Sequence, residues 1–258
     1  MFKRILKLIL VFILLFNLSC PFVYGQQVLK EDELFFAAKR AFEEGYYEAS
    51  LGLLNRFAKD YPESSEEPEA LILSGRCYLQ QNRVREAIKI FEGLIKKVPS
   101  KGPKDAVYYW LGESYLKLEE KDKASYYYRL VLDECQNSDY TSLAGYSLGW
   151  IYFSKGDFKE ALKIFKGLQE KYSSDPFRLP YVYFYIAEAE YYLENFQEAV
   201  NYYLKAISSK GNYLRPFLHL GLGWSYLRMN KGSQAGIEFD KVDESLLGEK
   251  ERRVLFSG

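Results

Sequence analysis

The chain has 258 residues, of which 48% are hydrophobic, so it is long enough and apolar enough to build a substantial core. Lys plus Arg and Asp plus Glu number 35 each, and three of the cations (Lys3, Arg4 and Lys7) lie at the extreme N-terminus. This composition excludes a disordered chain and lacks the basic footprint of a nucleic-acid-binding protein.

Residues 1–25 are predicted to be a secretory signal. Their basic start is followed by an apolar run, Leu8 to Phe16, which is shorter than the roughly 20 residues that a membrane span needs. Compact residues at Val23 and Gly25 form the pattern that a signal peptidase accepts, with cleavage after Gly25. The sequence therefore predicts a mature protein outside the cytoplasm, most simply in the periplasm of a bacterial envelope.

Two alternatives to cleavage after Gly25 remain open. Cys20 could be the lipid-bearing first residue of an outer-membrane lipoprotein, although Asn17 stands where lipoprotein signals usually carry Leu. The segment could also persist as an uncleaved anchor. Both place the body of the protein outside the cytoplasm, and the lipoprotein alternative associates it with the outer membrane.

Residues 26–258 are predicted to form one repeat domain. Short segments ending in Ala recur with separations of 38, 37, 37, 38 and 36 residues. A regular period of this length indicates a solenoid in which each repeat is one supersecondary unit. The six anchor residues are Ala49, Ala87, Ala124, Ala161, Ala199 and Ala235.

Each unit is predicted to be two helices joined by a short turn. A residue with little or no side chain stands twelve before each anchor, which indicates close approach of the two helices. A large residue stands four after it, one helical turn away, and breaker-rich segments such as YSSDPFRLP separate the units. The small residues are Ala37, Gly75, Gly112, Gly149, Ala187 and Gly223; the large ones are Leu53, Phe91, Tyr128, Phe165, Tyr203 and Phe239.

The stretch from Tyr181 to Tyr192 tests this register, because its aromatic and β-branched start has the composition of a strand. Its Ile186 and Ala187 occupy the same positions as Leu111 and Gly112 in the third unit. The repeat register therefore predicts a first helix here and overrides the local composition.

The repeats resemble the tetratricopeptide repeat. Leu111-Gly112, Tyr115, Ala124 and Tyr128 match the Leu-Gly, aromatic, Ala and aromatic positions of that motif. The resemblance covers residues 30 to about 245 and implies an all-α, right-handed α-solenoid superhelix of about six helix-turn-helix repeats. The period departs from the family's, because it is longer than 34 residues.

A narrower resemblance rests on fewer residues. Residues 61–64, Tyr-Pro-Glu-Ser, and the segment at 105–115 look like repeats of bacterial envelope proteins of the outer-membrane-assembly lipoprotein and Tol-Pal-associated types. Six repeats on a chain of this length also look like pilus-assembly lipoproteins. These likenesses imply a role in the cell envelope.

No catalytic or metal-binding constellation appears in the sequence. His219, the only histidine, is expected at the core or groove edge, and Glu113 and Glu188 are expected to be solvated groove residues and not a catalytic pair. Cys77 and Cys135 lack a CxxC or His partner, which predicts neither a disulfide scaffold nor a zinc site. The sequence thus predicts a protein that is not an enzyme and has no cofactor, metal or small-molecule substrate.

The family resemblance also implies a binding face. In tetratricopeptide repeats the concave surface is lined by first-helix residues three before the small position and one, four and five after it. An ordinary solvated face would carry Lys and Glu at these positions, whereas this chain carries mostly aromatic side chains, which binding surfaces use as anchors. The predicted groove consists of Tyr109, Glu113, Tyr146, Trp150, Phe153, Phe184, Glu188, Tyr192, Trp224 and Arg228.

The leading hypothesis is a non-catalytic scaffold in the cell envelope that binds a partner's extended peptide or helix in this groove. The alternative is an outer-membrane lipoprotein anchored at Cys20 that assists assembly of barrel proteins or acts as a pilotin for a pilus or secretin. The groove rings could also simply pack on neighbouring units of a tightly wound superhelix.

Overall fold

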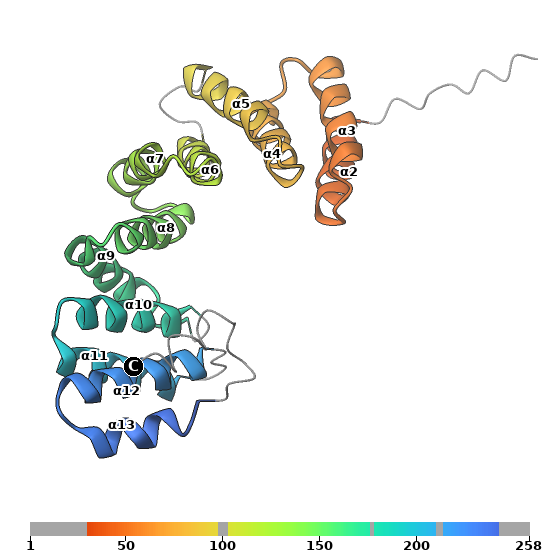
Figure 1. The fold of residues 1–258 in the computed structure, drawn as a ribbon. Coiled ribbons are helices and arrows are strands. Elements are labelled where there is room, and N and C mark those ends of the chain that lie inside the picture. Colours follow the sequence, from red (N-terminus) through yellow and green to blue (C-terminus); the bar gives the residue numbers. More distant parts are fainter. Residues whose placement is uncertain (1–29, 98–102, 176–177, 210–213, 243–258) are drawn as a thin grey trace, which may run out of the picture.

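The computed structural model describes residues 30–97, 103–175, 178–209 and 214–242. Within these ranges the chain forms twelve α-helices and no strand, arranged as six successive pairs (Figure 1). The predicted signal, including Cys20, lies outside the described residues. The first helices are α2 (Glu31–Glu43), α4 (Glu67–Gln80), α6 (Lys104–Lys117), α8 (Tyr140–Ser154), α10 (Leu179–Tyr192) and α12 (Arg215–Arg228); the second are α3 (Tyr47–Asp60), α5 (Val84–Lys97), α7 (Lys121–Glu134), α9 (Phe158–Lys171), α11 (Phe196–Ser208) and α13 (Gly232–Phe239).

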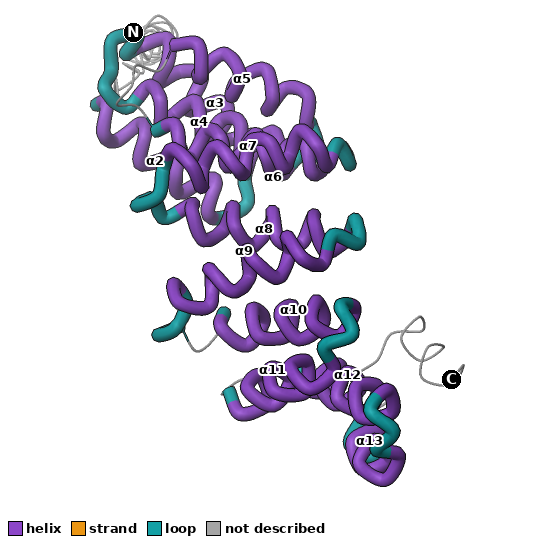
Figure 2. Tube along the Cα trace, turned by 90° about the vertical axis from the view of Figure 1, so that its left-hand side faces the viewer, coloured by secondary structure: helices purple, strands orange, loops and turns teal. Residues whose placement is uncertain are grey.

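The predicted α-solenoid of six helix pairs is confirmed. The pairs follow one another along an arc, and the views of Figures 1 and 2 agree that neighbours in sequence are neighbours in space. The helix pairs with the more extensive contacts are adjacent in the chain or belong to adjacent units. The strand-like stretch from Tyr181 to Tyr192 is helical within α10, as the register predicts.

One backbone feature recurs in the turn within every unit. A residue with positive φ, in the left-handed region, ends the first helix and turns the chain into the second. Glycine adopts this conformation without strain, whereas glutamate does so at a cost of about 1 kcal/mol. The six residues are Gly45, Asn82, Glu119, Gly156, Glu194 and Asn230.

The turn residues correct the register of the first unit. In units two to six the buried anchor is the fifth residue after the left-handed residue, and the same spacing from Gly45 leads to Ser50, not Ala49. Ala49 is exposed, whereas Ser50 is fully buried and its hydroxyl donates to the carbonyl of Ala38 at 2.8 Å. The first unit therefore packs one residue later than the sequence alignment placed it, with Ala38 and Leu54 as its small and large residues.

Within a unit, the small residue of the first helix receives the large residue of the second. A Cβ added at Gly112 would lie 2.5 Å from the Tyr128 ring, and one at Gly149 would lie 2.8 Å from the Phe165 ring. Both rings are fully buried. The glycines are packing residues, because only the missing side chain lets the two helices approach this closely.

Candidate functional site

First helices line the inner side of the arc. Contacts between first helices of successive units join α2 to α4, α4 to α6, α6 to α8 and α10 to α12, while no two second helices among those described approach each other to a similar extent. In a curved stack, the helices on the inner side lie closer together than those on the outer side. Figure 1 shows α6 and α8 on the inner side of the arc. The predicted groove residues all lie on these first helices.

Several predicted groove rings join into one aromatic cluster across units four and five. Tyr146 and Phe153 on α8 both meet the ring of Tyr185 on α10, at 5.7 and 5.8 Å between centroids. The Tyr192 ring stacks on that of Phe158 at 4.5 Å, with 7° between the planes. These rings do pack on a neighbouring unit, yet Tyr192 keeps 53% of its surface exposed.

Tyr185, the centre of this cluster, was not among the predicted groove residues. It lies two before the small residue Ala187, a position that the family pattern does not assign to the groove. Its ring stacks on Phe165 at 5.1 Å and meets Phe184 edge-on at 5.3 Å. The available signal was the aromatic content of the Tyr181 to Tyr192 stretch. Its rings cover more of the helix surface than one neighbouring helix can bury, so some of them must contact another unit.

The two predicted groove tryptophans occupy separate places. Trp150 is 37% exposed, and the Lys121 ammonium lies 5.4 Å from its ring centroid. Trp224 is half-buried and meets the Phe239 ring of its own unit at 5.5 Å. Near it, the exposed Arg228 pairs with Glu194 of the preceding unit at 3.3 Å.

Glu113 and Glu188 are not simply solvated. The Tyr128 hydroxyl donates to Glu113 at 2.6 Å, and the Tyr203 hydroxyl donates to Glu188 at 2.5 Å. Both hydroxyls belong to the buried large residue of the same unit, so each carboxylate satisfies a buried donor. Burial raises the pKa of Glu188, against the lowering effect of the hydrogen bond from Tyr203.

A pocket of about 400 Å³ opens where units three, four and five meet. Three predicted residues come together in it, namely Tyr109, Glu113 and Tyr146. Burial, followed by the charge of Glu113, raises the pKa of Tyr109. The other lining residues are Leu143, Ser147, Tyr172, Arg178 and Tyr181. Tyr172 and Arg178 come from the irregular link between units four and five, which a repeat register cannot place.

The inner side of the first two units is more basic. Lys39 and Arg76 stand one after the small residue, where later units carry Glu or Trp. Arg76 lies between two rings, with its guanidinium carbon 4.5 Å from the centroid of Phe42 and 5.0 Å from that of Trp110. A pocket of about 430 Å³ is lined by Arg76, Lys39 and Phe42 among others.

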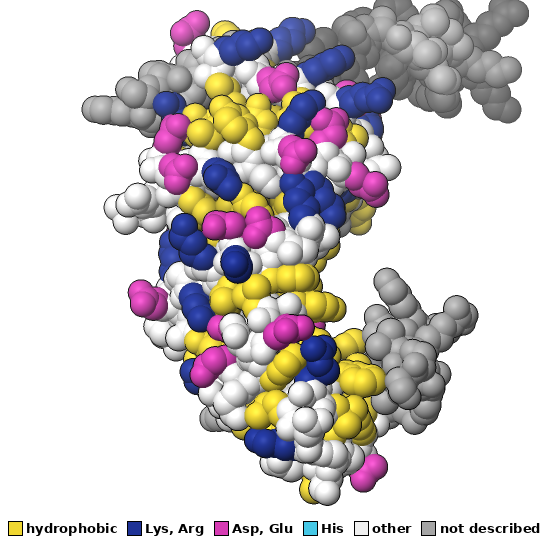
Figure 3. Space-filling view, turned by 60° about the vertical axis from the view of Figure 1, so that its left-hand side comes forward, with side chains coloured by type: hydrophobic (Ala, Val, Ile, Leu, Met, Phe, Trp, Pro, Cys, Tyr) yellow, Lys and Arg dark blue, Asp and Glu magenta, His cyan; other side chains and the backbone are white. Residues whose placement is uncertain are grey.

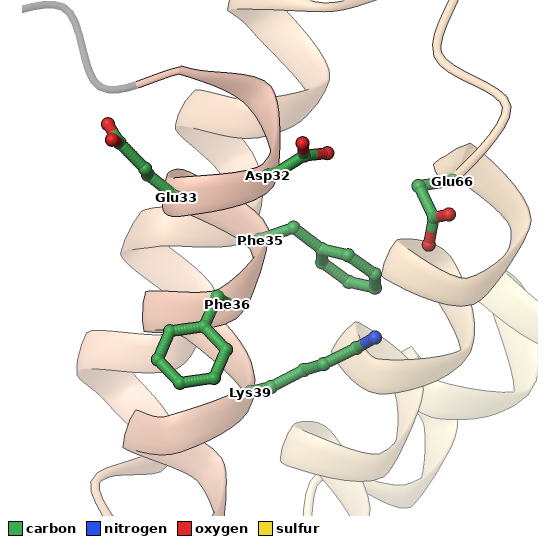
Figure 4. A pocket seen from close by; sticks show the side chains of 6 residues that line it. All are labelled: Asp32, Glu33, Phe35, Phe36, Lys39 and Glu66. Carbon is green, nitrogen blue, oxygen red and sulfur yellow. The ribbon is translucent and has the colours of Figure 1, made fainter.

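A third pocket, of about 480 Å³, lies beside it at the start of the solenoid. Figure 4 shows Phe35 and Lys39 extending from α2 towards Glu66, with the Lys39 ammonium 4.0 Å from the Phe35 ring centroid. Phe36, on the same helix, is 65% exposed. On the face shown in Figure 3, charges of both signs are interspersed with hydrophobic patches over successive units.

The histidine has a local partner. His219 Nδ1 lies 2.7 Å from a carboxylate oxygen of Glu238, and both side chains are largely buried. Among the described residues, no group of three or more His, Cys, Asp or Glu side chains is placed to hold a metal ion. None of the described helices combines the length and the apolar character that a membrane crossing requires.

Comparison with protein-family models decides the family. Models described as tetratricopeptide repeat match residues 37–106, residues 106–138 and 143–175, and residues 180–213. Together they cover more than half of the chain. The protein belongs to the tetratricopeptide repeat family. Members of this family are protein-protein interaction scaffolds, and the fold is typically non-catalytic. A search of the curated proteins found no match.

Solved structures show the same fold. The C-terminal part of a TPR repeat-containing protein from Cytophaga hutchinsonii is 20% identical, with 82% of this chain and 78% of that chain covered and a TM-score of 0.67. BtubC from P. vanneervenii is 17% identical over 89% of this chain and 93% of that chain, with a TM-score of 0.61. MamA of AMB-1 is 20% identical over 67% of this chain and 96% of that chain, with a TM-score of 0.54.

Proposed function

We propose that this tetratricopeptide repeat protein is a non-catalytic scaffold of the bacterial cell envelope that binds a partner's peptide or helix on the concave side of units three to six. The observation that carries the proposal is the aromatic lining of that side, where Trp150 and Tyr192 remain exposed beside the Tyr146, Phe153 and Tyr185 cluster. Exposed rings held by their neighbours are the anchors that binding surfaces use, because they lose little entropy on contact.

The partner segment should be rich in apolar residues, since the exposed rings offer apolar area for it to cover. The envelope location is supported by the signal-like start of the sequence. Labelling the expressed protein with a fatty-acid analogue separates the two envelope forms: incorporation that Cys20→Ser abolishes favours the lipoprotein, and no incorporation favours the free periplasmic form.

The binding face is tested by Trp150→Ala and Trp224→Ala, with crosslinking and recovery of the partner from the native envelope. Loss of either ring should weaken binding by about 1 to 3 kcal/mol with little change in melting temperature. Tyr126→Ala is the matched control, because Tyr126 is 59% exposed but lies on the second helix α7. If recovery is unchanged, or falls only in step with stability, the rings serve packing alone and the proposal is wrong.

A further inference from the structure

The pocket where units three, four and five meet has an acidic group that no described cation balances. Glu113 accepts hydrogen bonds from the hydroxyls of Tyr128 and Ser147, at 2.6 and 3.3 Å, and forms no ion pair within the described chain. Lys117, one turn further along α6, donates instead to the carbonyl of Leu79 at 3.0 Å. Neutral hydroxyls stabilise a carboxylate but leave its charge uncompensated.

Among the described residues, Arg178 is the one cation that lines this pocket, and it has a partner outside the pocket. Arg178 stands at the rim, 61% exposed, and its guanidinium pairs with Asp175 at 3.7 Å. The same guanidinium lies over the Tyr172 ring, 5.6 Å from its centroid. Because Asp175 balances Arg178, the charge of Glu113 sets the net charge of the pocket.

Most of the other lining residues are aromatic. Tyr109, Tyr146 and Tyr181 line the pocket with Tyr172, and their ring faces carry the negative part of the quadrupole that attracts a cation. A volume of about 400 Å³ accommodates a long side chain and lies in the range of small-ligand sites. A lysine or arginine side chain could lay its methylene stem on the rings and bring its charge to Glu113.

We propose that this pocket takes a cationic side chain, lysine or arginine, from the partner segment that the concave side binds. The inference rests on the proposed function and adds the charge that its partner must carry. It predicts that the segment combines apolar residues, which meet the rings of units four to six, with one cation that enters the pocket at unit three.

The protein contains its own control for this idea. Glu188 stands in unit five where Glu113 stands in unit three, and it also accepts a hydrogen bond from the buried tyrosine of its unit. Glu188 does not line any of the three pockets described above. Glu113→Gln and Glu188→Gln therefore remove the same charge and keep the same acceptor, but only the first change lies in the pocket where units three, four and five meet.

The test selects a phage-displayed library of random peptides on the purified wild-type protein and measures the affinity of the best peptides for both variants. We expect selected peptides to share one Lys or Arg. Their affinity should fall about 5- to 30-fold on Glu113→Gln and less than about 2-fold on Glu188→Gln. Replacing that cation by Gln in the peptide should cause a similar loss on the wild type and little further loss on Glu113→Gln.

Other outcomes overturn the inference. Lysine or arginine peptides that bind the wild type and Glu113→Gln equally well would place the cation elsewhere. Enriched peptides without a cation, whose binding Trp150→Ala weakens, would remove the cationic pocket and leave the proposed function standing. Failure to enrich any sequence would count against the proposed function and the inference together. Thermal unfolding of each variant confirms that the measured protein is folded.

Discussion

Gly149 tests the packing on which the solenoid depends. It lies within α8, and a Cβ at this position would stand 2.8 Å from Cζ of Phe165, with two further ring carbons at 3.0 Å. Real side chains avoid such distances, so Gly149→Ala requires the ring or the helix to move. The Phe165 ring is fully buried in its cluster, which leaves it little room to yield.

The magnitude follows from two opposing effects. Ala stabilises a helix interior by about 0.5 to 1 kcal/mol relative to Gly, whereas overpacking destabilises a core by about 1 to 3 kcal/mol. Gly167 on α9 isolates the second effect, because an added Cβ there meets nothing within 4 Å. Gly167→Ala should gain stability, and the two variants should differ by about 1 to 3 kcal/mol because the helix preference cancels. Gly149→Leu adds a bulkier group and should lose more than Gly149→Ala.

The assay is urea unfolding followed by circular dichroism, with melting temperatures as a second measure. For a chain of this size the two Ala variants should differ by about 2 to 12 °C in melting temperature. Equal stabilisation by Gly149→Ala and Gly167→Ala would show that α8 and α9 do not approach as closely as described, and the close-packing explanation of the small residues would be refuted.

Two further predictions concern buried carboxylates. Glu190 is 3% exposed and accepts a hydrogen bond from Lys166 at 2.8 Å. Lys166→Met should therefore lower the free energy of unfolding by about 1 to 2 kcal/mol, whereas Lys163→Met on the same helix should be near neutral. Equal effects of the two changes would argue against the stabilising role of the pair. Burial raises the pKa of Glu188 above its ordinary 4.5, so the folded protein binds a proton on this carboxylate more tightly than the unfolded chain does. The stability that this adds is present below about pH 4.5 and is lost as pH rises through the pKa of the folded state. Unfolding measured from pH 4 to pH 7 should therefore show Glu188→Gln gaining on the wild type as pH rises, and a constant difference would contradict this.

The sequence predicted the helix pairs and their partners from spacing alone, because the small and large positions of each unit must meet for two short helices to pack. Its error in the first unit came from aligning that unit on Ala49 and not on the turn before it. Gly45 carried the better signal, since a glycine or asparagine also stands five before the anchors Ala87, Ala161 and Ala235.

The binding face was less accessible to sequence reasoning. Register assigns residues to the concave side, but it does not say which rings a neighbouring unit covers, because that depends on the angle between units. Tyr146 and Phe153 are covered in part by Tyr185, while Trp150 is less covered. Pocket walls supplied by the link at Tyr172 and Arg178 lie outside any repeat pattern.

One correlation within the chain connects the core to the binding face. Units three and five have Tyr as the large residue and Glu one after the small one, and in both the Glu accepts from that Tyr. Units two, four and six have Phe instead, which needs no acceptor, and the same position holds Arg76, Trp150 or Trp224. Where the large residue is Tyr, the side chain one after the small residue is therefore used to accept a hydrogen bond from the buried hydroxyl. Where the large residue is Phe, that side chain has no such internal role and can contact a partner. Glu113 also lines the pocket where units three, four and five meet, so specificity should depend on the phenylalanine units and on unit three.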